Sequence, residues 1–246
     1  MNQPTNNSGI QGMIFAAGLG TRFKPWTDKH PKALAIVNGK SLLQRNIEYL
    51  QQYGITNVVV NVHHFADQIT DALEKNKGWG SHITISDETD MVLETGGGLK
   101  KAAPLFTSDT IVVINVDILT DLNLGNLIAF HRQHNPASTL AITNRTTSRY
   151  FLFDNNNTLC GWRNTKTGEE KIARTASEYI PKAFSGIHVI SKKLLSLIQR
   201  EGKFSIVDTY LELAPSHIIK GYDHSGSRFI DVGKPDSVAQ AELLFG

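Results

Sequence analysis

Short apolar runs alternate with amphipathic segments along the first 140 residues of the chain. Residues 13–17 form a continuous apolar run that ends at Gly18, a pattern typical of a strand buried on both faces of a parallel sheet. Similar runs follow at 58–60, 83–85 and 111–114. Between the runs, apolar residues recur at helical spacing, as in Leu43, Ile47 and Leu50. The alternation predicts an α/β fold with a mainly parallel sheet and helices on both faces.

The pattern changes at about residue 145. The segments 150–153 and 159–162 predict two strands joined by a polar turn, and the polar stretch 164–178 predicts a mobile loop or ribbon. Strand character returns at 183–190, and short helices and strands lead to a last helix that begins near Pro235.

No linker rich in glycine, serine or proline separates the two parts. We therefore predict a single domain over residues 1–246. Within it, a first part spans 10–144 and a smaller elaboration spans 145–246.

Composition narrows the class of protein. The chain has 246 residues, of which 40% are hydrophobic, and 25 Lys and Arg against 23 Asp and Glu give a net charge of +2. This near balance argues against a strongly basic nucleic-acid-binding protein. No apolar run approaches the roughly 20 residues of a membrane span, and residues 1–8 lack the features of a secretory signal. We expect a cytoplasmic protein in which Cys160, the single cysteine, forms no internal disulfide.

The most informative segment is the glycine-rich loop that follows the first predicted strand, at residues 16–25. It lacks the lysine pattern of a Walker loop, and Phe23 replaces the third glycine of a dinucleotide-binding loop. What remains is a glycine loop with nearby cations: Arg22, Lys24, Lys29 and Lys32. At about 4 Å and an effective dielectric near 20, each cation–phosphate pair is worth roughly 4 kcal/mol before desolvation. The loop therefore suits a ligand with several phosphates, although Lys24 and Lys29 are equally well explained as solvated surface residues.

Two carboxylates follow predicted strands. Asp117 follows 111–114, at the same sheet edge as the glycine loop, and Asp231 directly follows the segment 228–230. A carboxylate that faces a polyphosphate is a natural Mg²⁺ ligand, because Mg²⁺ prefers oxygen donors and is often shared between carboxylates and phosphates. A single aspartate at a strand end more often forms a turn or a helix cap.

The segments 15–27 (FAAGLGTRFKPWT) and 31–34 (PKAL) resemble the signature of the sugar-1-phosphate nucleotidyltransferases, and the resemblance extends from Met13 to Glu242. It implies the Rossmann-like nucleotide-diphospho-sugar transferase fold, with a nucleotide-binding half at 10–144 and a sugar-binding elaboration at 145–246. It also implies that Asp117, in Asn-Val-Asp where the family usually has Asn-Gly-Asp, binds Mg²⁺ together with Asp231 of Asp-Val-Gly. The implied reaction is attack by a sugar 1-phosphate on the α-phosphorus of a nucleoside triphosphate, with release of pyrophosphate.

The resemblance also implies roles for individual residues. Arg22 contacts the departing pyrophosphate, and Lys32 contacts phosphate near the reacting centre. The expected nucleotide-binding residues are Ala16, Ala17, Gly18, Gly20, Thr21, Glu88, Gly96 and Gly97. The expected sugar-binding residues are Glu94, Asn115, Ser185 and Gly186.

Three further segments, 61–64, 93–98 and 184–186, are similar to the N-acetylmuramate-1-phosphate uridylyltransferase group. Related mannose- and heptose-1-phosphate guanylyltransferases more often have Leu-Gly-Thr where this chain has Leu-Glu-Thr at 93–95. UTP with an N-acetylated or muramic sugar is therefore favoured. GTP with mannose or heptose, and a non-catalytic nucleotide-sugar-binding regulator, remain as alternatives. A nicotinamide-dependent reductase is disfavoured by the missing third glycine. The sequence leaves open the oligomeric state and the roles of His63, His64 and 164–178.

Overall fold

The computed structural model describes residues 9–246, so the N-terminal segment considered above, residues 1–8, lies outside the described part. Within it, ten strands form one sheet. Eight of them follow the order β11 (Glu170–Ile172), β10 (Leu159–Asn164), β9 (Arg149–Phe153), β12 (Ile180–Ser191), β6 (Thr110–Asn115), β1 (Ile10–Phe15), β4 (Asn57–Val62) and β5 (His82–Asp87). The other two are β8 (Ser138–Thr143), which pairs with β12, and β13 (Ile219–Asp223), which pairs with β8.

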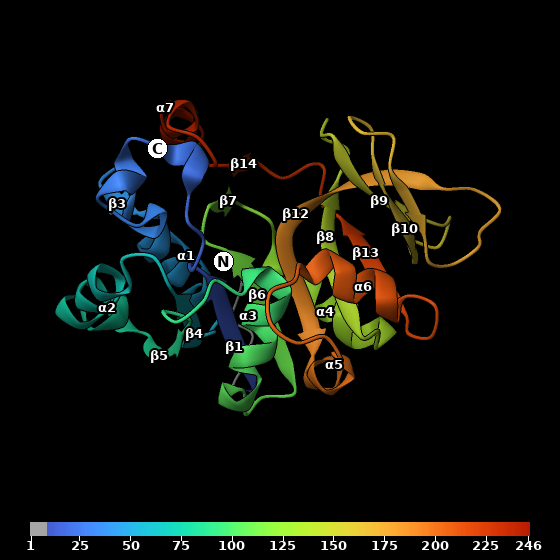
Figure 1. Cartoon of the computed structure of the whole chain (residues 1–246), viewed down its shortest axis with the longest axis horizontal. Coiled ribbons are helices and arrows are strands. Elements are labelled where there is room, and N and C mark those ends of the chain that lie inside the picture. Colours follow the sequence, from blue (N-terminus) through green and yellow to red (C-terminus); the bar gives the residue numbers. More distant parts are fainter. Residues whose placement is uncertain (1–8) are drawn as a thin grey trace.

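The half of the sheet that contains β1, β4, β5 and β6 is parallel, as the apolar runs predicted (Figure 1). All six residues of β1 are buried, and Met13 is in register with Val59 on one side and Val113 on the other. Antiparallel strands then extend the sheet, beginning with the long strand β12 against β6. The mixed, mainly parallel sheet with helices on both faces confirms the predicted fold class.

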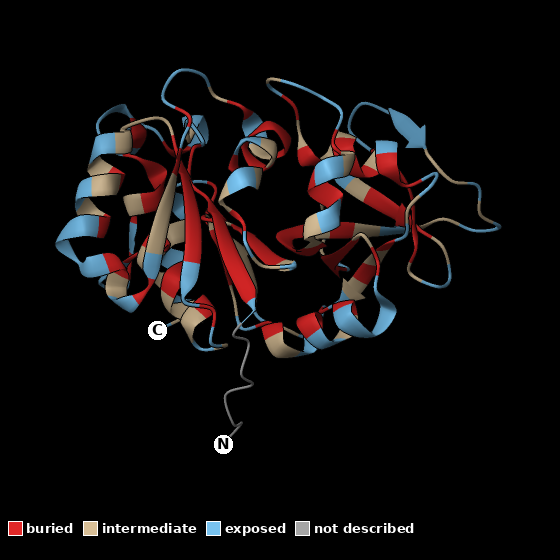
Figure 2. Ribbon diagram, turned by 90° about the horizontal axis from the view of Figure 1, so that it is seen from below, coloured by how far each residue is buried: buried red, intermediate tan, exposed pale blue. Residues whose placement is uncertain are grey.

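Two hydrophobic clusters lie on the two faces of the sheet, because successive side chains of a strand point to opposite sides. In β1, Ile14 belongs to one cluster and Met13 to the other. The helices that cover the sheet are α1 (Leu42–Gln51), α2 (Ala66–Lys75), α3 (Glu94–Ala102), α4 (Leu124–His134), α5 (Lys192–Leu197), α6 (Ile206–Leu213) and α7 (Asp236–Leu244). Figure 2 shows their buried sides facing the strands and their exposed sides facing outward. None of the helices in residues 9–246 has the length and apolar character required to span a membrane.

Several short elements were not anticipated from the sequence. Two two-stranded ribbons pair β7 (Ile118–Thr120) with β14 (Phe229–Asp231) and β2 (Ile36–Val37) with β3 (Lys40–Ser41). Short 3-10 turns lie at η1 (Thr21–Phe23), η2 (Trp26–Asp28), η3 (Lys32–Leu34), η4 (Lys77–Gly80) and η5 (Ala103–Leu105). The polar stretch 164–178 forms a ribbon in part, because β11 within it pairs with β10.

Candidate active site

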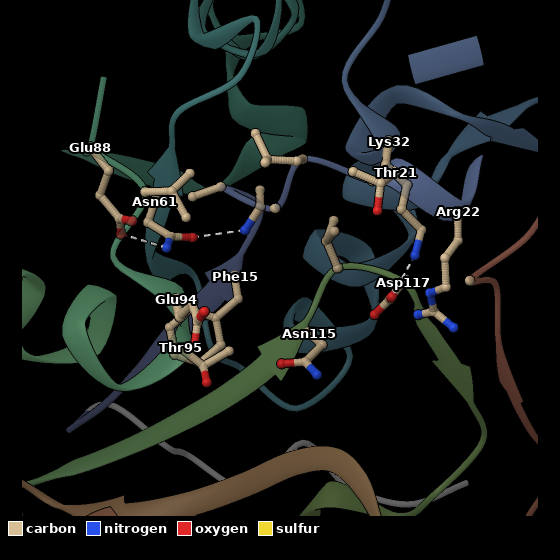
Figure 3. A pocket seen from close by; sticks show the side chains of 18 of the residues that line it. Phe15, Thr21, Arg22, Lys32, Asn61, Glu88, Glu94, Thr95, Asn115 and Asp117 are labelled. Carbon is tan, nitrogen blue, oxygen red and sulfur yellow. Dashed lines mark hydrogen bonds and ion pairs between the residues drawn. The ribbon is translucent and has the colours of Figure 1, made fainter. Parts of the chain in front are cut away.

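A cavity of about 470 Å³ opens at the carboxyl ends of β1 and β6 (Figure 3). Its lining comes from the glycine-rich loop, from β6 and the residues after it, and from the start of α3. The lining residues are Phe15, Ala16, Ala17, Gly18, Leu19, Gly20, Thr21, Arg22, Lys32, Asn61, Glu88, Val92, Glu94, Thr95, Asn115, Val116, Asp117, Lys203 and Gly233. Ligands of open α/β sheets bind at this edge, so the cavity lies where the fold itself favours a site.

The glycine-rich loop turns sharply at Gly20, which has a φ of 60°. A Cβ there would lie 2.8 Å from Cγ2 of Thr27, so the position excludes larger residues both by conformation and by space. The Thr27 hydroxyl donates a 3.0 Å hydrogen bond to the Gly20 carbonyl, and the Phe23 N–H donates a 2.7 Å bond to the same oxygen. These contacts fix the turn η1, which carries Arg22 into the cavity.

Asp117 and Asp231 are brought together by the ribbon of β7 and β14. Asp231 pairs in register with Ile118, and the N–H of Val232 donates a 2.8 Å hydrogen bond to the carbonyl of Asp117. Burial and the nearby Asp117 carboxylate raise the pKa of Asp231. The two carboxylates therefore interact directly through their charge, as expected of a pair that shares a cation.

Two cations surround this pair. Lys32 Nζ lies 2.5 Å from Asp117 Oδ2, and the Lys32 side chain is 10% exposed. A Cβ on Gly233 would lie 2.8 Å from Asp231 Oδ1 and 3.1 Å from a terminal nitrogen of Arg22. The glycine of Asp-Val-Gly thus leaves room for the Arg22 guanidinium beside the second carboxylate.

The carboxylate pair fits a divalent cation shared with phosphates. Asp231 Oδ1 is buried and accepts no hydrogen bond from residues 9–246, which is costly for an acceptor unless another group completes it. No cluster of three or more His, Cys, Asp or Glu side chains in the described part of the chain could enclose an ion. Two carboxylates with open positions for phosphate oxygens suit Mg²⁺.

The other side of the cavity is organised around Asn61 and Glu88. Asn61 Oδ1 accepts a 2.7 Å hydrogen bond from the Ala16 N–H, and Asn61 Nδ2 donates a 2.7 Å bond to Glu88 Oε1. Glu88 is 1% exposed, and burial raises its pKa. A Cβ on Gly98 would lie 2.6 Å from Glu88 Oε1, so the third glycine of α3 makes room for the carboxyl group.

Most of the predicted site residues line this one cavity, but five do not. Asp231 lies beside it, against Asp117. Gly96 and Gly97 pack instead against the segment 202–205, and the Gly96 N–H donates a 2.9 Å hydrogen bond to the Phe204 carbonyl. Their lack of side chains permits close helix–loop packing, and their predicted contact with the nucleotide stays a prediction.

The last two of the five are predicted sugar contacts. Ser185 is 1% exposed, and its hydroxyl is 2.7 Å from His224 Nε2. Gly186 has a φ of 72°, and a Cβ there would lie 2.7 Å from Asn115 Nδ2. Neither residue lines the cavity, but Gly186 packs against the Asn115 side chain, which does; their predicted contact with the sugar stays a prediction.

Other lining residues were missed as site residues. Asn61 is polar within an apolar strand, and Thr95 belongs to Leu-Glu-Thr at 93–95, signals that could have identified both. Lys203 stands in no recognisable motif. The two neighbouring histidines bind backbone near the site: His63 Nδ1 lies 2.6 Å from the Glu88 carbonyl oxygen, and His64 Nε2 lies 3.3 Å from that of Thr27.

An α/β sheet with a glycine loop, two cations and a carboxylate pair at its edge defines a nucleotide-transferring enzyme. The chain belongs to the nucleotidyl transferase family, whose profile matches residues 11–244. It is 31% identical to the N-acetylmuramate alpha-1-phosphate uridylyltransferase of Caulobacter vibrioides over 235 residues, which cover 94% of each chain. It is 26% identical to the mannose-1-phosphate guanyltransferase of Yarrowia lipolytica, covering 96% of this chain and 64% of that one. The predicted resemblance is confirmed, and these relatives support sugar-1-phosphate nucleotidyltransferase activity.

Solved structures agree on the fold. HddC from Yersinia pseudotuberculosis complexed with GMP-PN has a TM-score of 0.75 at 23% identity, covering 96% of this chain and 99% of that one. A UDP-glucose pyrophosphorylase complexed with UDP-glucose has a TM-score of 0.75 at 16% identity, covering 95% and 97%.

Proposed function

We propose that the protein catalyses the Mg²⁺-dependent transfer of a uridylyl group from UTP to the 1-phosphate of an N-acetylated or muramic sugar. The products are a UDP-sugar and pyrophosphate. The observation that carries the proposal is the convergence of Asp117 and Asp231, far apart in sequence, beside Arg22 and Lys32 at the mouth of one cavity.

The reaction requires little proton transfer. An oxygen of the sugar phosphate attacks the α-phosphorus, forming a new O–P bond, while the bond from that phosphorus to the bridging oxygen of pyrophosphate breaks. The attacking phosphate is already ionised at neutral pH, so rate enhancement comes from alignment and charge neutralisation. Mg²⁺ held by Asp117 and Asp231 would neutralise phosphate charge, while Arg22 binds the departing pyrophosphate and Lys32 the phosphate near the reacting centre.

In this proposal, the glycine loop and the Asn61–Glu88 pair bind the nucleotide. Residues 16–21 of the loop line the cavity where phosphates and ribose would lie, and Glu88 is a buried acceptor beside them. Asn115 and Glu94 remain for the sugar.

The test uses Asp117→Asn and Asp231→Asn, assayed by pyrophosphate release with Mg²⁺. Each variant keeps the side-chain shape but loses the charge, so we expect kcat to fall by at least about 100-fold, as when a comparable charge-stabilising group is removed. Asp154→Asn, in the turn between β9 and β10, is the control and should retain activity. Full activity in either site variant would refute the carboxylate-pair proposal.

The choice of nucleotide is tested in the same assay by crossing UTP, GTP, CTP, ATP and dTTP with a panel of sugar 1-phosphates. The favoured result is UTP with N-acetylmuramic acid 1-phosphate, supported by the 31% identical Caulobacter relative. Turnover with GTP and mannose or heptose 1-phosphate would instead establish the guanylyl alternative, which the Yarrowia relative supports. Nucleotide binding without turnover would establish a regulator.

A further inference from the structure

Lys203 lies in the lining of the cavity, although it belongs to the irregular segment before α6. The next residue, Phe204, is hydrogen-bonded to the start of α3 through both its N–H and its carbonyl. The Phe204 N–H donates a 3.1 Å hydrogen bond to the Leu93 carbonyl, and the Phe204 carbonyl accepts a 2.9 Å bond from Gly96. The Thr95 hydroxyl oxygen accepts a 3.0 Å bond from the Ile206 N–H. Lys203 is thus held at the cavity by a well-bonded backbone.

Cations occur in two separate parts of the lining. Among the described lining residues, Arg22 and Lys32 stand with Asp117, whereas Lys203 stands with Glu94. Figure 3 shows Glu94 and Thr95 across the cavity from Arg22 and Asp117. A substrate that fills the cavity would therefore meet positive charge both at its phosphates and at a distant point.

The existing partner of Lys203 is weakly held. Nζ lies 3.5 Å from Glu94 Oε1, and the two side chains are 55% and 46% exposed, so solvent screens the pair. Glu94 itself has a φ of 58°, in the left-handed region that glutamate rarely adopts. Such strained residues cluster at binding sites, where a fixed side-chain direction is needed. The ammonium group is therefore free to exchange Glu94 for an anion of the substrate.

We propose that Lys203 is a specificity-determining residue that binds a carboxylate on the sugar of the acceptor substrate. This inference rests on the proposed function, because it assumes that a sugar 1-phosphate occupies the part of the cavity next to Glu94. It goes further in assigning the acceptor to the class of sugar 1-phosphates that carry a second anionic group away from the anomeric phosphate.

The experiment compares two acceptors that differ only in the carboxylated ether at O3: N-acetylmuramic acid 1-phosphate and N-acetylglucosamine 1-phosphate. UTP is the donor, and kcat/KM is measured for the wild-type chain, Lys203→Met and Lys203→Arg. Lys203→Met should lower kcat/KM for the carboxylated sugar about 10- to 100-fold, the range expected for losing one charge-assisted hydrogen bond. The kcat/KM for the neutral sugar should change less than about threefold, because this sugar does not contact the Lys203 side chain.

Lys203→Arg should retain most of the wild-type preference for the carboxylated sugar, because it keeps the positive charge. Lys75→Met, on an exposed turn of α2 outside the cavity, is the matched control and should change kcat/KM for neither acceptor. Equal losses on both acceptors, a loss confined to the KM for UTP, or a wild-type preference for the neutral sugar would each overturn the inference while leaving the proposed function standing. Absence of wild-type turnover with every sugar phosphate would instead refute the proposed function and, with it, the inference.

Discussion

Glu94 occupies a backbone conformation that suits glycine, with a φ of 58° at the first residue of α3. The Glu94 side chain lines the cavity and forms an ion pair with Lys203, so the strained backbone places this carboxylate at the site. For an L-residue other than glycine, a left-handed conformation costs roughly 1–2 kcal/mol. In the proposed role of Glu94 at the sugar, stability and recognition therefore oppose each other.

We expect Glu94→Gly to raise the free energy of unfolding by roughly 1 kcal/mol, because glycine adopts this φ without steric cost. The same change should lower kcat/KM for the sugar phosphate, since the carboxylate is lost. Urea unfolding and steady-state kinetics measure the two effects. The control is Glu74→Gly, on the exposed side of α2, which should lower the free energy of unfolding by about 0.5–1 kcal/mol. A destabilised Glu94→Gly variant would contradict the interpretation.

At the scale of elements, the short ribbon of β7 and β14 positions the two carboxylates of the site. Each strand has only three residues, yet their pairing brings Asp117 and Asp231 together. Asp121 closes the other end of the ribbon, accepting 2.7 Å hydrogen bonds from both the N–H and Nε of Arg228. The ribbon is therefore held by backbone pairing at one end and by a side-chain clamp at the other.

Asp121→Ala should loosen the ribbon without unfolding the protein. The ion pair is largely exposed, so we expect the free energy of unfolding to fall by less than about 1 kcal/mol. The Mg²⁺ concentration for half-maximal activity should rise at least about 10-fold, a common effect of losing support for metal-binding carboxylates. A Mg²⁺ titration of pyrophosphate release measures it. Glu170→Ala, which removes the exposed pair with Arg163 in β10, should leave the titration unchanged; an equal shift in both variants would refute the role of the clamp.

The whole molecule is built around β12, which belongs to the C-terminal part of the chain but lies in the middle of the sheet. It pairs with β6 on one side and with β8 and β9 on the other (Figure 1). Both hydrophobic clusters combine residues from before and after residue 144: Ile14 with Val189, and Met13 with Phe151. Neither cluster is confined to one half of the chain.

We therefore predict that residues 9–144 do not fold alone, because their removal from β12 exposes the edge of β6 and opens both clusters. The full chain should unfold in a single cooperative transition when followed by both circular dichroism and tryptophan fluorescence. The isolated fragment should show no such transition. A cooperatively folded 9–144 fragment would show instead that the nucleotide-binding half is an independent domain.

The sequence by itself determined the parallel half of the sheet and the glycine loop, because both depend on local patterns: apolar runs of strand length and glycines at a strand end. It also determined the family, through the signature segments at 15–27 and 31–34. The resemblance implied that Asp117 and Asp231 act together, but only the tertiary structure shows how they meet. The three-residue strands β7 and β14 carry too few residues for a recognisable period, yet they join the two carboxylates. Only the structure shows that glycines 96, 97 and 186 permit close packing, and Lys203 had no motif to mark it. Such outcomes depend on the space left between elements far apart in sequence, which no local pattern encodes.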